Sequence, residues 1–323
     1  MKLATVKNAS LCDIKAAINA LDTNKRLKVN GLYAADIEAL KNSSPALFAR
    51  VADFIKSGRW YPFVGTYSNN TELSPAALIK SCLYSVQYFK TNFGKEYRVF
   101  HGTKIYNGCL PQIIYSSLFD AAFIDSETQT RWLCGTDGHR TLSVYSETVS
   151  ADDCTDGEFM TCEEYAQQLF STEMNLETLT LPSEYTMPDD IERELLNAEC
   201  YSVISENEQT ADIRKAWIKY LTGDKNGAAA DAVRISNNKT ADISSVFRVS
   251  ESSVTISELK YAEDGSGDTV LRVRETSGKE KSAYIMCDRL SAGFRFEIMP
   301  YEIQTFRIKG DGSGSVTEIY ICE

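Results

Sequence analysis

Apolar residues in the first half of the chain alternate between helical spacing and short continuous runs. Pro45 begins a segment with an apolar helical face that ends at Gly58, and Ser74 and Pro75 begin a second one that ends near Gly94. Short apolar runs, typical of buried strands, occupy residues 61–65, 97–100 and 121–124, and a further helix is expected at 110–117. This β-α-β-α-β order predicts parallel strands joined by right-handed crossovers. We therefore expect an α/β domain with a barrel-like parallel sheet over residues 1–147.

The next part of the chain, residues 148–235, is expected to hold an acidic connector and a small helical hairpin or bundle. Residues 148–190 are acidic and irregular, apart from a short helix expected at 161–170. One amphipathic helix begins at Pro188, and a second carries Trp217 on its apolar face and ends at Gly223. Residues 226–240, rich in Ala, Asn and Asp, are predicted to form a linker.

From about residue 254 onward the spacing of apolar residues changes from helical to alternating. Alternating runs separated by glycine-rich turns predict antiparallel strands, so we expect an antiparallel β domain over residues 236–323. The stretch from Asp311 to Ser315 is expected to be a hairpin turn. It is not a phosphate-binding loop, because no helix follows it.

Charge and hydropathy exclude two classes of partner. The formal net charge is −11, from 34 basic and 45 acidic residues, and no basic stripe is present. Binding of phosphate backbones needs clustered Lys and Arg, so nucleic acid is not an expected partner. No apolar stretch approaches the ~20 residues that cross a bilayer, and residues 1–14 lack the core of a signal peptide. We therefore expect no membrane association and a cytoplasmic location.

Cysteine and histidine offer few ligands for a metal. The nine cysteines are scattered singly with no Cys-x-x-Cys pair, as expected for reduced and mostly buried thiols. His101 and His139 are the only histidines, so a nitrogen-rich metal site would need additional oxygen ligands. The sequence predicts no metal site and no cofactor.

The chemistry of an α/β protein is expected in the loops after the carboxyl ends of its strands, here 66–73, 101–108 and the stretch after 124. Cleavage of a glycosidic bond needs two carboxylates, and Glu72, Asp125, Glu127 and Asp137 are the candidates. For each of them a solvated loop charge or a helix cap is the commoner explanation. Asp137 stands out because the tight turn around it could hold its side chain rigidly, although a plain turn aspartate is the alternative.

Two further residues are candidates for binding. His101 follows a strand directly and could act as an acid, a base or a ligand. Trp60 could stack on a sugar ring, or it could pack at the junction of a helix and a strand. The loop 101–108 contains no carboxylate, and the chain has no nucleophile elbow, Walker motif or dinucleotide-binding motif. The sequence thus argues against a working hydrolase.

Several segments together resemble family 38 glycoside hydrolases, the retaining α-mannosidases. Residues 44–60 resemble the family's helix leading to a Gly-Arg-Trp turn, and Leu110-Pro-Gln112 is similar to a family tripeptide. Residues 131–138 resemble its Trp-x-Gly-x-Asp-Gly segment. Segments similar to its helical bundle and its final β domain follow in order: 194–199, 215–217, 259–265, 271–275 and 300–305. The resemblance implies the α/β, helical and β organisation described above.

The departures from the family pattern bear on activity. Alignment back from Leu110 places Gly102 where the resemblance implies the aspartate that is both nucleophile and zinc ligand. No His-x-Asp pair is present, residues 221–231 contain no histidine, and residues 67–70 replace an acidic family motif. Asp137 alone falls on a family position whose carboxylate lies close to the catalytic site. The family's zinc site is therefore predicted to be lost, and its large β-sandwich is missing.

Three hypotheses remain. The first is a non-catalytic α-mannosidase-like protein that either retains weak binding of mannose-containing carbohydrate or acts as an interaction module, with Trp60, Glu72, His101 and Asp125 as candidate binding residues. The second is an altered retaining glycosidase that uses Asp137 with Glu72 or Asp125 and no zinc. The third is a structural module that completes a larger partner or a homo-oligomer.

Overall fold

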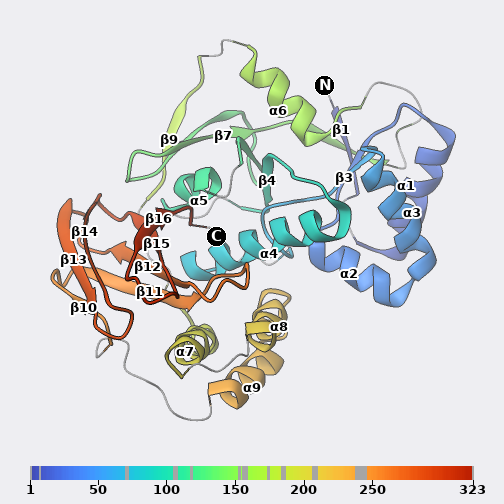
Figure 1. Ribbon diagram of the computed structural model, residues 1–323. Helices are drawn as coiled ribbons and strands as arrows, with labels where there is room; N and C mark the ends of the chain where they lie inside the picture. Colours follow the sequence, from blue (N-terminus) through green and yellow to red (C-terminus); the bar gives the residue numbers. More distant parts are fainter. Residues whose placement is uncertain are drawn as a thin grey trace.

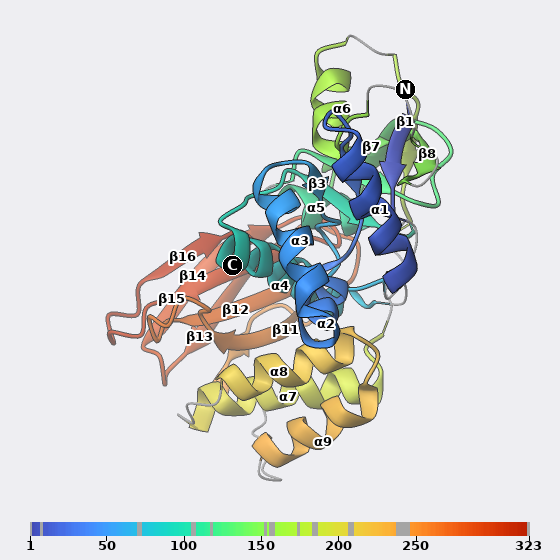
Figure 2. The same cartoon turned by 90° about the vertical axis from the view of Figure 1, so that its right-hand side faces the viewer.

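The structure is a computed structural model that describes residues 2–6, 9–69, 73–104, 108–116, 119–151, 154, 159–172, 175–182, 187–205, 210–236 and 246–321. Helix α4 (Pro75–Phe93) lies at the centre of the molecule. The amino-terminal helices lie on one side of it and the carboxyl-terminal strands on the other, while α7, α8 and α9 lie below it in both views (Figure 1, Figure 2). Among these described residues, no helix is both long and apolar enough to cross a membrane.

The first sheet is formed by four parallel strands in the order β3-β2-β1-β8. The strands are β1 (Lys2–Thr5), β2 (Val29–Asn30), β3 (Trp60–Tyr61) and β8 (Glu147–Ser150). The intervening helices are α1 (Leu11–Thr23), α2 (Ala34–Ser43) and α3 (Pro45–Lys56). Ser10 caps α1 by accepting the amide of Asp13, and Pro45 occupies the first turn of α3, where its missing N–H costs nothing.

The second sheet has five strands in the order β4-β5-β7-β6-β9. They are β4 (Val99–Gly102), β5 (Ala121–Ile124), β6 (Arg131–Cys134), β7 (Arg140–Val144) and β9 (Thr178–Thr180), with α5 (Leu110–Ser116) and α6 (Cys162–Phe170) as the accompanying helices. Strands β4, β5 and β7 are parallel, whereas β6 runs antiparallel to β7. An isolated parallel bridge pairs His101 of β4 with Gly65, in the segment that follows β3. The predicted α/β organisation with a parallel sheet is confirmed, and barrel closure stays a prediction.

The acidic segment after residue 147 is more ordered than the sequence suggests. Expected to be irregular apart from one helix, it contributes β8 beside β1 and β9 beside β6. The expected helix is present as α6, and Thr161 and Glu164 form its capping box. The division of the chain at residues 147 and 235 stays a prediction.

A three-helix bundle follows, formed by α7 (Asp190–Ser205), α8 (Thr210–Leu221) and α9 (Lys225–Ser236). The predicted linker at 226–240 is wrong over its first part, because α9 occupies it and packs against α7 and α8. Ala228, Ala232 and Ile235 form its buried face at helical spacing, and Asp224 accepts the amide of Gly227 at 3.0 Å. Small alanine side chains allow this close packing. Residues 237–245 lie outside the described part.

The carboxyl-terminal region is formed by two antiparallel sheets, β10-β13-β14 and β11-β12-β15-β16, as predicted. Their strands are β10 (Arg248–Val249), β11 (Val254–Tyr261), β12 (Thr269–Glu275), β13 (Lys281–Cys287), β14 (Ala292–Ile298), β15 (Ile303–Ile308) and β16 (Val316–Ile319). Side chains from both sheets, among them Leu271, Ile285 and Phe306, share one apolar core. The turn at 311–315 joins β15 to β16, as expected for a hairpin.

Candidate functional site

His101 lies at the edge where β4 and β5 end, which we call the carboxyl edge. The pairing of β4 with β5 sets His101 beside Phe123, and the imidazole stacks between two aromatic rings. The ring of Phe63 is 3.6 Å away at 9° and that of Phe123 is 5.4 Å away at 17°, measured between centroids. Nδ1 shares a hydrogen bond of 3.0 Å with the hydroxyl of Tyr33, and His101 is 2% exposed. The imidazole is thus held rigidly and almost wholly away from solvent.

Asp125 is the second predicted residue at this edge. Its amide donates to the carbonyl of Gly102 at 3.0 Å, which continues the β4–β5 pairing by one residue. Its Oδ1 lies 3.2 Å from Nε2 of His101, which is within ion-pair distance, but the two atoms do not form a hydrogen bond. The Asp125 side chain is 46% exposed. The structure therefore brings His101 and Asp125 together, and Asp125 is the group that a ligand would meet first.

Asp137 lies at the opposite edge of the same sheet. Because β6 runs antiparallel to β7, the turn that joins them lies beyond the amino ends of β4 and β5. The carboxylate of Asp137 accepts the amide of His139 at 3.0 Å and lies 3.3 Å from its Nδ1. This hydrogen-bonded partner raises the pKa of His139 above its usual value. These contacts are those of a turn aspartate, and the geometry separates Asp137 from Asp125.

The other candidates do not join the carboxyl edge. Trp60 is 1% exposed and donates its indole N–H to the carbonyl of Gly31 at 2.9 Å, so a sugar has no access to its ring. This is the packing role that the sequence left open. Gly102 is the last residue of β4, and Glu72 lies outside the described residues. Glu127 forms a bidentate ion pair with Arg131 at 2.6 and 2.8 Å, which occupies both of its oxygens.

A metal site was not expected, and the described ranges contain no group of three or more His, Cys, Asp or Glu side chains that could hold an ion. Among the described residues singled out from the sequence, the candidate ligands at the carboxyl edge are His101 and Asp125. A structural or catalytic zinc needs three or four protein ligands. The loss of the family's zinc site stays a prediction.

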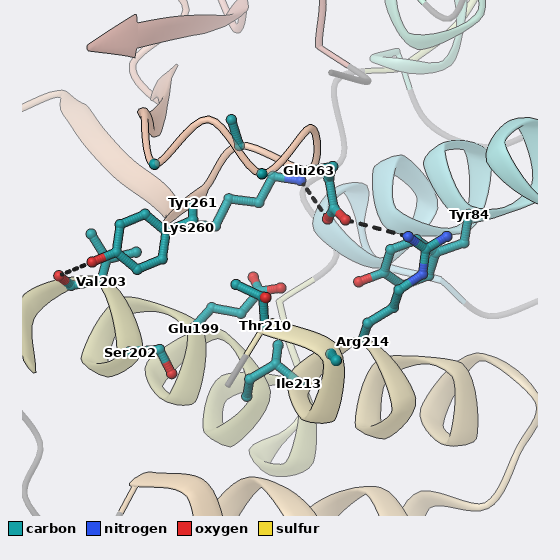
Figure 3. A pocket seen from close by; sticks show the side chains of 14 residues that line it. Tyr84, Glu199, Ser202, Val203, Thr210, Ile213, Arg214, Lys260, Tyr261 and Glu263 are labelled. Atoms are coloured by element: carbon teal, nitrogen blue, oxygen red, sulfur yellow. Dashed lines mark hydrogen bonds and ion pairs between the residues drawn. The ribbon is translucent and has the colours of Figure 1, made fainter. Parts of the chain in front are cut away.

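The structure also contains a cavity that the sequence did not reveal. This charged cavity, of about 880 Å³, lies between α4, α7, α8 and the turn from β11 to β12 (Figure 3). Its charged lining groups are Glu199 on α7, Arg214 on α8, Lys260 on β11, and Glu263 in the turn. The available signal was the spacing of Glu258 and Lys260, two charged residues two positions apart and therefore on one face of the strand.

Buried ion pairs lie against the wall of the charged cavity. Lys80, which has no exposed side-chain surface, binds Glu199 at 2.8 Å and also pairs with Glu258. Glu258 in turn pairs with Arg272 on the neighbouring strand. Charges this deeply buried are stable only when paired, so these contacts fix α4 against α7 and the β domain.

Lys260 gives a prediction that depends on pH. Burial, followed by the nearby charge of Lys80, lowers its pKa to about 8, although Glu263, 3.0 Å away, and Glu199 oppose this. The unfolded lysine keeps its proton up to about pH 10.4. Between these values the unfolded chain binds more protons, so the contribution of Lys260 to the free energy of unfolding rises with pH.

We therefore expect the stability of the unmodified protein, relative to Lys260→Met, to increase by about 1–2 kcal/mol between pH 7.5 and 9.5. Urea denaturation of both proteins at the two pH values measures this difference. The subtraction removes every titration that the two proteins share. A difference that stays constant over this interval would show that Lys260 titrates normally.

Comparison with known proteins bears on the fold. No protein-family model matches the chain, and no curated protein is similar to it in sequence. Among solved structures, a protein of glycosyl hydrolase family 38 from Enterococcus faecalis matches with a TM-score of 0.59 and 11% identity, covering 95% of this chain and 53% of that one. An α-mannosidase from Enterococcus faecalis V583 matches with a TM-score of 0.60 and 9% identity, covering 95% and 55%.

A 4-α-glucanotransferase from Thermococcus litoralis is also similar, with a TM-score of 0.50 and 9% identity over 91% of this chain and 67% of that one. At these identities the likeness shows the fold alone. The chain has a fold like that of family 38 glycoside hydrolases, as the sequence resemblance implies, and it spans about half the length of the first two structures.

Proposed function

We propose that this chain is a non-catalytic relative of the family 38 α-mannosidases that binds mannose-containing carbohydrate at its carboxyl edge. The observation that carries the proposal is the environment of Gly102. At the strand end where the resemblance implies a nucleophile, there is no side chain to attack a sugar. Of the described carboxylates that the sequence singled out, Asp125 alone lies at this edge with a half-exposed side chain.

A retaining glycosidase needs a second carboxylate, and the carboxyl edge does not supply one among the described candidates. Retention requires two carboxyl groups about 5–5.5 Å apart, one of them to form the covalent intermediate. Asp125 has no such partner among the described residues singled out from the sequence, since Glu127 pairs with Arg131 and Asp137 lies at the opposite edge. The altered glycosidase with Asp137 and Asp125 is therefore the weaker hypothesis.

The side chains at the carboxyl edge support the binding of a sugar. A half-exposed carboxylate can accept two sugar hydroxyls, and the stacked rings of Phe63, His101 and Phe123 hold the neighbouring imidazole in place. Rigid surroundings of this kind reduce the entropy cost of binding.

The test combines activity and binding. We expect no hydrolysis of an aryl α-mannoside above background, no stoichiometric zinc in the purified protein, and heat on titration with mannobiose. Asp125→Asn should weaken that binding about tenfold or more, because a hydrogen bond to a charged group contributes about 1.5–3 kcal/mol.

Asp120→Asn provides the control, since Asp120 is similarly exposed but pairs with Arg98 at the amino end of β5. Hydrolysis that disappears in Asp125→Asn would establish the altered glycosidase instead. An absence of heat with mannobiose would remove the binding part of the proposal and leave a structural role.

A further inference from the structure

The charged cavity contains a buried acceptor without a donor. Oε1 of Glu199 accepts a hydrogen bond from Nζ of Lys80 at 2.8 Å, whereas its Oε2 is buried and has no hydrogen-bond partner. Glu199 is 5% exposed and lines the cavity, and Figure 3 shows its carboxylate pointing away from α7 toward the space below Lys260. A buried acceptor left unsatisfied costs about 1–3 kcal/mol. A ligand hydroxyl that donates to Oε2 would recover this energy.

The opposite wall presents donors. Lys260 has three N–H donors, and the one contact that its ammonium makes to Glu263 is 3.0 Å long. Arg214 lies over the ring of Tyr84, with its guanidinium carbon 4.7 Å from the centroid, and its Nη1 reaches Glu263 only at 3.5 Å. Both cations line the cavity, and each has more N–H donors than these contacts use.

The first turn of α8 adds to this wall. Thr210 and Ala211 line the cavity, and the amides in the first turn of a helix have no partner within the helix. The amino end of a helix also carries partial positive charge. These features favour a negatively charged group near Lys260 and Arg214.

The two cations of this wall share one carboxylate. Arg214 and Lys260 both pair with Glu263, whereas Glu199 on the other wall pairs with Lys80. A carboxylate supplied by a ligand beside Arg214 and Lys260 would add charge-assisted contacts that a neutral or cationic ligand cannot make. A volume of about 880 Å³ is that of a site for a small molecule.

We propose that the charged cavity binds a small hydroxylated carboxylate of the sugar-acid class. Its carboxylate pairs with Arg214 and Lys260 near the first turn of α8, and one of its hydroxyls donates to Oε2 of Glu199. The site is formed by α4, α7, α8 and β11, and it does not depend on the carboxyl edge.

Three probes separate the two parts of the proposal. D-glucuronate carries both a carboxylate and hydroxyls, D-glucose lacks the carboxylate, and cyclohexanecarboxylate lacks the hydroxyls. Calorimetric titration of the full chain at pH 7 and low salt should show D-glucuronate binding at least about tenfold more tightly than either of the others, as expected when each lost charged contact costs about 1.5 kcal/mol or more.

Variants locate the site. Arg214→Gln should weaken D-glucuronate binding about tenfold or more. Glu199→Gln keeps an acceptor for Lys80. It should weaken the binding of D-glucuronate but not the binding of cyclohexanecarboxylate. Arg234→Gln is the matched control, because Arg234 is an exposed arginine of α9 that does not line the cavity. Asp125→Asn should leave D-glucuronate binding unchanged, which separates this proposal from the one above.

Arg214 is one-third exposed, so its variant is expected to fold even if Glu199→Gln does not, and thermal denaturation checks both. Equal binding of all three probes, no binding of D-glucuronate, or binding that Arg214→Gln leaves unchanged would each overturn the proposal.

Discussion

Replacing Lys80 by methionine is expected to lower the free energy of unfolding by about 3–5 kcal/mol. Lys80 has no exposed side-chain surface and pairs with two carboxylates that are themselves buried, Glu199 and Glu258. Methionine matches the aliphatic stem of lysine but supplies no charge. Glu199 would then face the protein interior without the cation that lies 2.8 Å from its Oε1, and Glu258 would retain Arg272 alone.

Lys90→Met is the control for this prediction. Lys90 lies on the same helix, and its ion pair with Glu96 is exposed on both sides, so its loss should change stability by no more than about 1 kcal/mol. Urea denaturation at pH 7 measures both variants. If Lys80→Met costs as little as Lys90→Met, the buried carboxylates must become protonated or reach water without cost, and the ion pairs do not hold α4 in place.

The order of elements could be predicted from the sequence wherever a helix carries large apolar side chains or a clear cap. Pro45 and Ser74 mark the starts of α3 and α4, and β5 occupies the predicted residues 121–124. Helix α9 was missed because its buried face begins with the small residues Ala228 and Ala232, whose helical spacing does not stand out in a stretch rich in Asn and Asp. Strands β8 and β9 were missed because they pair at sheet edges and are only partly buried.

The candidate site residues, too, could be placed from the sequence only in part. His101 and Asp125 could be predicted to meet, since parallel neighbouring strands end at one edge. Asp137 could not be placed, because its position depends on the direction of β6, and the hydrophobic pattern does not show whether a strand is parallel or antiparallel. The charged cavity is formed by residues from 84 to 267 that only tertiary packing brings together.

The central helix connects these sites physically. From Pro75 to Ser85 nearly every residue of α4 is buried, with Lys80 among them. One side of α4 packs in the core of the α/β region and the other contacts the bundle. Helix α4 also precedes β4, the strand that carries His101, so a shift of α4 at the charged cavity would also affect β4. The ion pairs of Lys80 therefore stabilise the scaffold of the carboxyl edge without contacting it.

Replacing Gln112 by alanine is expected to lower the free energy of unfolding by about 2–6 kcal/mol, because two buried backbone groups each lose their partner at about 1–3 kcal/mol. Gln112 belongs to the tripeptide that carries part of the family resemblance. Its Nε2 donates to the carbonyl of Ile303 at 2.6 Å, and its Oε1 accepts the amide of Ile303 at 3.2 Å. Both residues are buried, so water cannot easily replace the side chain.

These two bonds join α5 to the first residue of β15, which makes Gln112 a direct polar link between the α/β region and the β domain. Gln129→Ala is the control, since Gln129 is exposed and bonds Glu177 at 3.2 Å, and its loss should cost no more than about 0.5 kcal/mol. Urea denaturation measures the free energy of unfolding of both variants. For Gln112→Ala, amide hydrogen exchange should show the largest loss of protection at Ile303. Unchanged protection there, together with a small loss of stability, would mean that the packing of α5 against β15 suffices without Gln112.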